Sequence, residues 1–384
     1  MSMRRPLFLP VSRLSRLSRL SRRIGARAKQ RGAAIITALL VVALSAILVS
    51  GMLWRQQVQL RRIENQRLLT QAQWISRSAL DWTRLVLRSE ADTSAGVTYL
   101  GGAWGMPVAR TRLSDFLGQI GEVRADQGAD TWLSGSIEDA QARYNLRNLV
   151  TASAPGALQL NLTQIQAFAR LLQLLGVDGQ LAKNAAVYLR SGLAYSVTRF
   201  QTASAGVTAS GTAATQPVAG GAGGGANFTS NPGLSDGDSN SGSAPILMTS
   251  VDALLDVPGF TPDIVARLRP FVTILPTTTP VNMNTATAEV IASIVQGMSL
   301  SSAQAFVSRR QTVFFRNLSD VQLALTGAGS PQTGIDSTLC DVNSNYFLVH
   351  GRVQHERAVV DRTTLVWRDP LTHVTRIVRV RDES

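Results

Sequence analysis

The feature that most constrains this chain is an apolar run of 22 residues, AAIITALLVVALSAILVSGMLW, at positions 33–54. It contains no charged side chain and lies between Arg31 and Arg55. As a helix it would span roughly 30 Å, the hydrocarbon core of a bilayer. A single span in lipid must be helical, because only a helix satisfies its own backbone hydrogen bonds. The alternative is a buried core helix, but such helices rarely stay apolar on every face over this length. We therefore predict one transmembrane helix.

The residues before the apolar run carry ten basic side chains and no acidic one. By the positive-inside rule, this flank stays in the cytoplasm and the C-terminal part crosses the membrane. The flank also supplies ten of the formal net charge of +13, which leaves +3 for the rest of the chain. A nucleic-acid-binding domain needs a basic surface of its own. We therefore expect no nucleic acid partner.

The junction KQRG-AAIITALL resembles that of a type IV pilin-like precursor. An ordinary secretory signal has its small-residue cleavage site after the apolar region, whereas Gly32 precedes it here. The resemblance implies that a prepilin peptidase cleaves between Gly32 and Ala33, removes residues 1–32 as a basic leader, and leaves Ala33 to be N-methylated. The apolar helix would then remain in the mature protein.

Thr37 occupies the fifth mature position, where pilins and most pseudopilins have glutamate. In those proteins the carboxylate is thought to meet the free amine of a neighbouring subunit inside the membrane, where an unpaired charge is costly. A missing glutamate on a large body resembles the type II secretion system protein K family, the K family below. The resemblance is strongest at residues 31–90 and 245–320.

The resemblance to the K family implies a minor pseudopilin without enzymatic activity, anchored once in the inner membrane with its body in the periplasm. It implies a place at the pseudopilus tip, in complex with the I- and J-type minor pseudopilins and next to the major pseudopilin. There it would prime assembly of the fibre that exports folded proteins across the outer membrane. The alternative is a membrane-anchored helix-hairpin-helix DNA-binding protein of a DNA-uptake or type IV pilus system.

The remaining pattern predicts an α+β fold, with a long pilin-like N-terminal helix packed on an antiparallel sheet. We expect this helix to comprise the membrane half, 33–54, and a periplasmic half, 55–96, that ends near Ser94 to Gly96. Trp74 and Trp82 should lie in the core. The body takes residues 97–150 and 335–384, where YFLVHGRVQ, AVVDRTTLVW and VTRIVRVR are predicted as strands.

Residues 151–334 are predicted to form an inserted α-helical domain of two SAM-like or helix-hairpin-helix modules, which resemble those of the K family. One helix follows Leu162 and stops at Gly176, and a second lies around Lys183 to Leu189. Further caps are expected at Ser250, at Thr261 before Pro262, near Ser301, and at Ser319 with capping-box spacing to Gln322. Residues 203–244 are rich in Gly, Ala, Ser and Thr and are predicted to be a disordered loop.

The DNA-binding alternative depends on the VPGF turn at Val257–Phe260 and on the NMNTA run that follows. Helix-hairpin-helix proteins offer backbone N–H groups to phosphate from such a turn. The segment 250–276 has only Arg267 and Arg269 as basic residues, against three aspartates. A phosphate-binding surface needs a positive excess, so this segment is a poor DNA-binding candidate.

Oxygen side chains alternate at Asp236, Asp238 and Asn240, as at the start of a calcium loop. K-family proteins can bind calcium, which makes it the candidate ion. However, Gly242 is one place late for an EF-hand, and no glutamate follows where one is needed. The alternative is a solvated turn. The series Asp341, Asn343 and Asn345 is similar but poorer, and is expected to be a turn before a strand.

The sequence offers no constellation for catalysis. His350 and His355 are five residues apart on a predicted strand and should point to opposite faces. Cys340 is the only cysteine and has no zinc-site neighbours, and His373 stands apart. No HExxH motif or nucleophile elbow occurs. We expect structural roles for all four residues.

Overall fold

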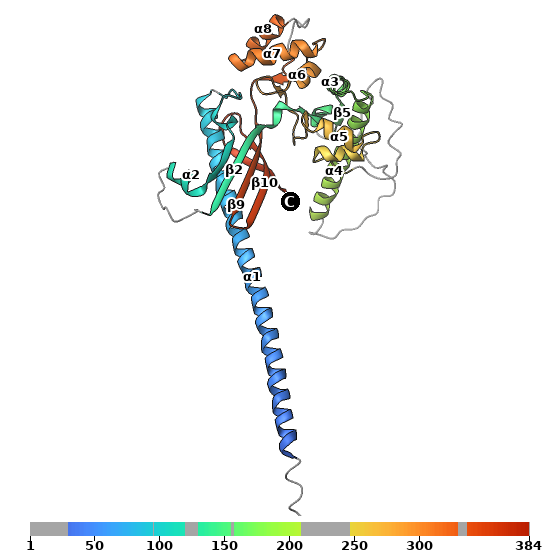
Figure 1. Ribbon diagram of the computed structural model, residues 1–384. Coiled ribbons are helices and arrows are strands. Elements are labelled where there is room, and N and C mark those ends of the chain that lie inside the picture. Colours follow the sequence, from blue (N-terminus) through green and yellow to red (C-terminus); the bar gives the residue numbers. More distant parts are fainter. Residues whose placement is uncertain are drawn as a thin grey trace, which may run out of the picture. The chain divides into compact units, whose positions relative to one another are not determined.

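The computed structural model describes residues 30–94, 96–119, 130–154, 157–208, 246–328 and 336–383. Its contacts divide the chain into two compact units, Met1–Arg67 and Leu68–Ser384, which we consider separately. One helix, α1 (Gln30–Thr93), contributes to both (Figure 1). Gly96, just beyond its end, has a φ of 83°, a conformation that glycine adopts without strain. The predicted long helix and its end near Ser94 to Gly96 are confirmed.

Five antiparallel strands form the sheet of the second unit, in the order β1-β2-β9-β10-β11. They are β1 (Val108–Arg112), β2 (Thr131–Asp139), β9 (Tyr346–His355), β10 (Ala358–Arg368) and β11 (Thr375–Glu383). Figure 1 shows the green β2 beside the red β9 and β10, so strands far apart in sequence are neighbours. The three predicted C-terminal strands and the α+β class are confirmed.

From Leu68 onward, α1 covers one face of this sheet. Its buried residues are spaced three or four positions apart, as one face of a helix requires. Leu68 and Ala72 contact apolar side chains of the sheet in one cluster, and Leu80 and Leu87 do so in another. The buried apolar side chains of α1 are Leu68, Ala72, Leu80, Leu87 and Ala91.

The two tryptophans of α1 do not lie in this core as predicted. Trp74 is 62% exposed, because it follows the buried Ala72 by two positions, about 200° around the helix. Trp82 is 36% exposed and packs edge-to-face on Phe116 of α2 (Leu113–Gln119), with 5.0 Å between the ring centroids. The prediction is wrong for Trp74, and Trp82 sits at the margin of the core.

The residues between β2 and β9 form mainly short helices that pack around a separate core. They are α3 (Leu162–Leu174), α4 (Leu181–Thr208), η5 (Val251–Asp256), α5 (Pro262–Leu268), α6 (Ala288–Ile294), α7 (Leu300–Thr312) and α8 (Leu318–Gly327). Gly176 and Gly297 have φ values of 72° and 74° and follow α3 and α6, as expected of stop glycines. Helix α4 runs to Thr208, into the segment predicted as a loop, and residues 209–244 lie outside the described residues.

Two of the predicted helix caps need correction. Thr261 caps α5 as expected, with its hydroxyl accepting from Ile264 N–H at 3.4 Å. Helix α7 is capped by Ser299 rather than near Ser301, and α8 by Asn317 rather than Ser319. A cap must have extended backbone outside the helix, whereas Ser301 and Ser319 lie within the first turns. Ser250 precedes η5 without a capping hydrogen bond from its side chain.

Short strands join the helical region to the chain on either side of it. Parallel pairs form between β3 (Tyr144–Asn145) and β6 (Val272–Thr273), and between β7 (Val281–Asn282) and β8 (Cys340–Asp341). An unpredicted hairpin, β4 (Val150–Ala154) and β5 (Ala157–Leu160), precedes α3. The core of this region runs from Tyr144 to Val342, so its ends belong to the same buried cluster as its helices. The domain limits at 151 and 334 stay predictions.

Candidate functional site

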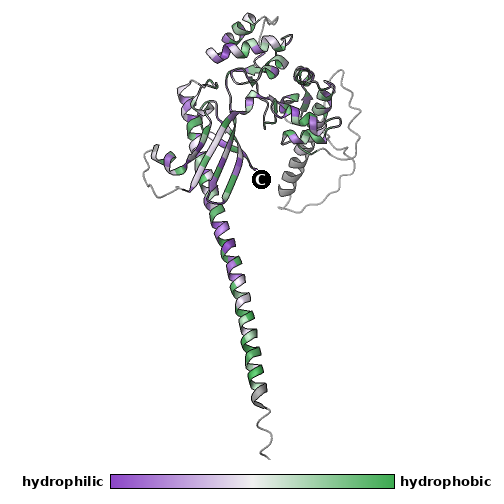
Figure 2. Ribbon diagram, in the orientation of Figure 1, coloured by the Kyte–Doolittle hydropathy of each residue, from purple (hydrophilic) through white to green (hydrophobic). Residues whose placement is uncertain are grey.

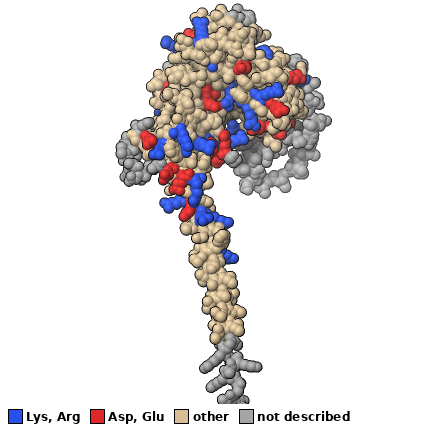
Figure 3. Space-filling model, viewed as in Figure 1, with Lys and Arg blue, Asp and Glu red and all other residues tan. Residues whose placement is uncertain are grey.

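The apolar part of α1 is suited to a membrane. It is the one helix, among the described residues, that is long and apolar enough to span a bilayer. Figure 2 shows this part in green, and Figure 3 shows no charged side chain along it. Every described side chain from Ala34 to Arg67 is exposed to the surroundings within its own unit. This length and composition fit a membrane anchor.

The residues of the predicted cleavage junction lie at the beginning of this helix. Gly32 and Ala33 are in its first turn. The Thr37 hydroxyl donates to Ala34 O at 3.0 Å, so its proton is satisfied within the helix. A neutral, internally bonded side chain is inexpensive in hydrocarbon compared with a carboxylate. Cleavage at Gly32 and methylation of Ala33 stay predictions.

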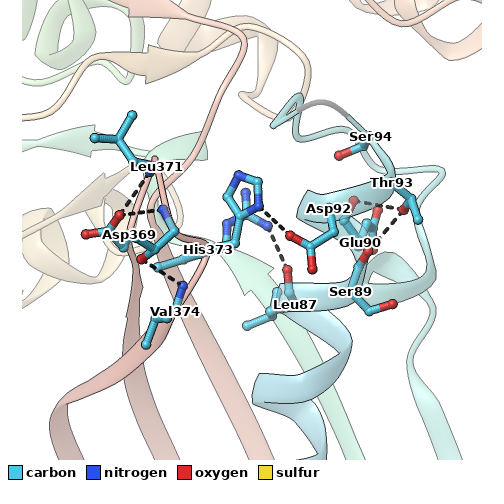
Figure 4. Close-up of polar contacts among 12 residues, drawn as sticks. Leu87, Ser89, Glu90, Asp92, Thr93, Ser94, Asp369, Leu371, His373 and Val374 are labelled. Atoms are coloured by element: carbon cyan, nitrogen blue, oxygen red, sulfur yellow. Dashed lines mark hydrogen bonds and ion pairs between the residues drawn. The ribbon is translucent and has the colours of Figure 1, made fainter.

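At its other end, α1 is fixed to the turn between β10 and β11. Figure 4 shows Asp92 and His373 pointing toward each other, and Asp92 Oδ1 lies 2.7 Å from His373 Nδ1. Asp369 folds the turn by accepting from the N–H groups of Leu371 at 2.9 Å and Thr372 at 2.8 Å. These backbone donors lower the pKa of the Asp369 carboxyl. The turn and the last turns of α1 are thereby held together.

A buried carboxylate joins the sheet to the helical region. Asp139, the last residue of β2, is 5% exposed. Its Oδ2 accepts from Ser344 Oγ at 2.6 Å, Thr285 Oγ1 at 2.6 Å and Asn282 Nδ2 at 2.9 Å. Its Oδ1 accepts from the Gln141 N–H at 2.8 Å. Burial raises the pKa of Asp139, while the four donors act in the opposite direction.

Arg368 supplies the positive charge next to this carboxylate. It is 4% exposed, at the end of β10. Its guanidinium donates to Leu87 O of α1, to Thr98 Oγ1 and to Ser344 O, each at 3.0 Å. Burial lowers the pKa of Arg368, and the charges of Asp139 and Glu90 oppose that shift. We call Asp139, Arg368 and the residues hydrogen-bonded to them the buried node. It connects α1, the sheet and the helical region.

Buried asparagines add further links around the buried node. Asn148 exchanges two hydrogen bonds with the Thr279 backbone, at 2.7 and 2.9 Å. Asn284 does the same with the Phe315 backbone, at 2.9 Å each. Asn145 binds the carbonyl of Thr277 at 2.8 Å. Each amide replaces a backbone partner where no regular secondary structure supplies one.

Sequence reasoning missed the buried node and these asparagines. The asparagine spacing in YNLRN and NMN was a visible signal, because amides that flank apolar residues often bind backbone groups. The NMNTA run had instead suggested a DNA-binding hairpin. Asn282 and Asn284 are 0% and 3% exposed, so they are not available to a phosphate.

The predicted calcium ligands Asp236, Asp238 and Asn240 lie outside the described residues. Within the described ranges, no three His, Cys, Asp or Glu side chains come together as a metal site. Asp341 accepts from the Val342 N–H at 2.7 Å and belongs to β8. The series at 341–345 thus precedes β9, and its first residue, Asp341, pairs with Asn282 of β7.

The histidines and the cysteine have structural environments. On β9, His350 lies 2.9 Å from Thr363 Oγ1, whereas His355 lies 3.2 Å from Gln71 Oε1 of α1. The two rings therefore face opposite sides of the sheet, as predicted. Burial raises the pKa of the Cys340 thiol to about 12, which makes it a poor nucleophile.

Comparison with known proteins identifies the family. Two family models described as type II secretion system protein K match residues 142–277 and 281–343, together just over half of the chain. The type II secretion system protein K of Pseudomonas aeruginosa is 31% identical over 162 residues. That alignment spans 41% of this chain and 43% of the relative.

A solved structure agrees at the level of the fold. A chain in the crystal structure of the GspK-GspI-GspJ complex from the enterotoxigenic Escherichia coli type 2 secretion system superposes with a TM-score of 0.54. The match covers 84% of this chain and 99% of that one, at 14% identity. The matched sequence segments contain most of the helical region and, of the buried node, Asn282 and Thr285. The chain therefore belongs to the type II secretion system protein K family.

Proposed function

We propose that this chain is a minor pseudopilin of a type II secretion system, located at the pseudopilus tip and priming fibre assembly for the export of folded proteins. The observation that carries the proposal is the buried node, which joins a large helical region to a pilin-like sheet and helix by hydrogen bonds. Such bulk suits the first subunit of a fibre better than a repeating subunit, which must stack closely on its neighbours. The I- and J-type minor pseudopilins are the proposed partners, with the major pseudopilin below.

The short helix pairs of the helical region are proposed to be SAM-like modules that act as protein scaffold. Arg269 already forms an ion pair with Asp252 at 2.5 Å, which leaves the VPGF segment with little free positive charge. The face of the molecule in Figure 3 carries both signs of charge interspersed. These features favour protein contacts over DNA binding, which requires a basic stripe. No catalytic role is proposed.

The test is co-purification of the full chain, expressed in membranes with the I- and J-type minor pseudopilins of its own secretion system. Duplex DNA serves as the competing bait at low and moderate salt. A stoichiometric three-protein complex without DNA retention would support the proposal. Salt-sensitive DNA retention without pseudopilin partners would contradict it and favour a DNA-uptake protein.

Thr37→Glu tests the placement at the tip. A carboxylate at this position would need a cationic partner within the membrane. We expect the variant to enter the shaft or to lower secretion, measured by fibre composition and by the amount of exported protein. Thr37→Ser is the matched control, because it keeps a neutral hydroxyl. Unchanged fibres and secretion in Thr37→Glu would overturn this placement.

Maturation is proposed to produce Ala33 as an N-methylated first residue after cleavage behind Gly32. Mass spectrometry of the purified N-terminal peptide checks both steps, with Gly32→Val as the uncleavable control. Calcium binding through Asp236, Asp238 and Asn240 also stays a prediction. Calorimetric titration of the metal-free chain, compared with Asp236→Asn, would check it.

A further inference from the structure

The last strand of the sheet, β11, presents an open edge. Among the described strands, β10 is its only neighbour. After the buried Thr375, the other eight residues of β11 are all exposed. A strand with one free edge carries unpaired N–H and C=O groups, which can pair with an added strand.

The two faces of β11 differ in chemistry. Its arginines pair in register with Trp367, Leu365 and Thr363 and share their face of the sheet; they are Arg376, Arg379 and Arg381. Ile377 and Val380 pair with Val366 and Thr364, on the face that α1 covers. These two apolar side chains are 45% and 46% exposed, so α1 does not fully cover them. The edge is therefore basic on one face and apolar on the other.

The positive charge on the basic face is only partly balanced within the chain. Arg381 lies 3.7 Å from Asp252, with its side chain 65% exposed. Asp252 is already paired with Arg269 at 2.5 Å. Arg379 donates to a carbonyl, Thr249 O, rather than to an acid. Asp252 is thus shared by Arg269 and Arg381, while Arg379 has no acidic partner among its described contacts.

The acids at the end of β11 do not provide the missing negative charge. Asp382 binds Arg362 at 2.6 Å, and Glu383 accepts from the Thr363 hydroxyl at 2.6 Å. A second copy of the chain is also a poor occupant, because pairing β11 with β11 would place arginines beside arginines. Like charges on neighbouring strands destabilise a sheet. The charge complement of this edge is acidic.

We infer that β11 is a docking edge for an extended segment of a neighbouring minor pseudopilin, with acidic side chains alternating with apolar ones. The segment adds a sixth strand beside β11. Its acidic side chains lie against Arg376, Arg379 and Arg381, and its apolar ones extend the face of Ile377 and Val380. The arginines favour a segment with acidic side chains over a neutral or basic one, and so select this partner. This inference rests on the proposed function and assigns a surface to it.

The experiment uses the full chain, co-expressed with the I- and J-type pseudopilins and solubilised in detergent. Arg379→Glu with Arg381→Glu should lower the co-purified partner by about tenfold, equivalent to about 1.4 kcal/mol. The loss should resemble the effect of raising the salt concentration on the wild-type complex, because exposed charges are screened. Lys183→Glu with Arg316→Glu changes the charge equally, away from β11, and should have no effect.

Asp252→Asn separates docking from an internal role of the arginines. This change removes the ion pair with Arg381 but leaves the edge more positive, so binding should persist or increase. If the arginines only tether η5 to the sheet, Asp252→Asn and the arginine variants should weaken the complex alike, and that result would overturn the inference. Thermal melts of each variant control for folding.

Hydrogen exchange provides the second readout. In the wild-type complex, amides of Arg376–Asp382 that face the open edge should exchange at least tenfold more slowly than in the chain alone. A wild-type complex with unchanged exchange there, or one insensitive to the arginine variants, would overturn the docking edge alone. Failure of the wild-type chain to form any complex would overturn the proposed function, and this inference with it.

Discussion

At the scale of single residues, Asp139 is the side chain whose charge matters most. Asp139→Asn keeps the shape but points an amide N–H at the donors that the carboxylate now binds, and removes one of the two carboxylates, Asp139 and Glu90, whose charges act on Arg368. Removing one partner of a buried charge cluster costs about 3–5 kcal/mol. We expect a loss of that size in the free energy of unfolding, measured by denaturant titration.

Asp361→Asn is the matched control for that measurement. Asp361 is also on the sheet, but its partner Arg352 is 3.4 Å away at the surface. Exposed pairs contribute under about 1 kcal/mol. Equal destabilisation by the two substitutions would show that the buried node does not depend on the charge of Asp139.

His350 and Glu138 should give the sheet a pH-dependent stability. Interaction with the Glu138 carboxylate raises the pKa of His350 above 6.5, and the same interaction lowers the pKa of Glu138 below 4.5. The raised histidine stabilises below its unfolded pKa and loses this effect as the pH rises through its folded pKa. The lowered glutamate stabilises above its unfolded pKa and loses this effect as the pH falls. The pair therefore contributes most between pH 4.5 and 6.5.

The measurement is the melting temperature from pH 4 to pH 9 for the wild type and His350→Gln. Thr363, Glu383 and Arg143 also lie near the ring, and Glu383 acts in the same direction as Glu138 while Arg143 opposes it. We expect the largest difference near pH 5.5 and a decreasing one above pH 7. Both side chains are more than a third exposed, so the effect should stay under about 1 kcal/mol. A difference that grows with pH would contradict this account.

At the scale of elements, the cap of α8 is Asn317 in the structure, whereas the capping-box spacing in the sequence favoured Ser319. Asn317 Oδ1 accepts from the Asp320 N–H at 2.9 Å. Asn317→Ala should cost about 1 kcal/mol of unfolding free energy. Ser319→Ala, the position that the capping-box spacing favoured, should be nearly neutral. The two thermal melts check this directly, and the reverse order would mean that α8 begins later than the structure places it.

Helical elements could be predicted well from sequence, because their signals are local. The apolar run, the stop glycines and the Thr261-Pro262 start each act within one or two turns. The errors have equally local causes. Trp74 is apolar and lies in a helical pattern, which predicted burial, but its angle around the helix from Ala72 leaves its side chain exposed. The hairpin of β4 and β5 was not predicted, because it lies next to the strong helical pattern that begins at Leu162.

At the scale of the whole molecule, unfolding of the second unit should be cooperative. The core of the helical region and the clusters beneath α1 are separate. They are joined by the buried node and by a small cluster that includes Leu275 and Tyr346. We expect one calorimetric transition for the wild type, and two for Arg368→Met, which removes the hydrogen bonds to Leu87 and Ser344. Two transitions in the wild type would show that the joint is weak.

The long-range contacts could not be predicted from residue patterns. Asp139 and Arg368 are far apart in sequence, and each alone reads as an ordinary charged residue at the end of a strand. Only the folded chain places Ser344 between them, where it is hydrogen-bonded to both. The membrane anchor was therefore predictable, because one segment suffices for it, whereas the buried node was not, because it combines segments far apart in the sequence.

The buried node also determines how force travels. Under the proposed function, a growing fibre pushes its leading subunit from below, through the periplasmic part of α1. From Leu87 the path continues through Arg368, Ser344 and Asp139 to Asn282 and Thr285, by hydrogen bonds of 2.6–3.0 Å. Within the second unit, force on the last turns of α1 would therefore reach the helical region through hydrogen bonds between buried groups as well as along the backbone.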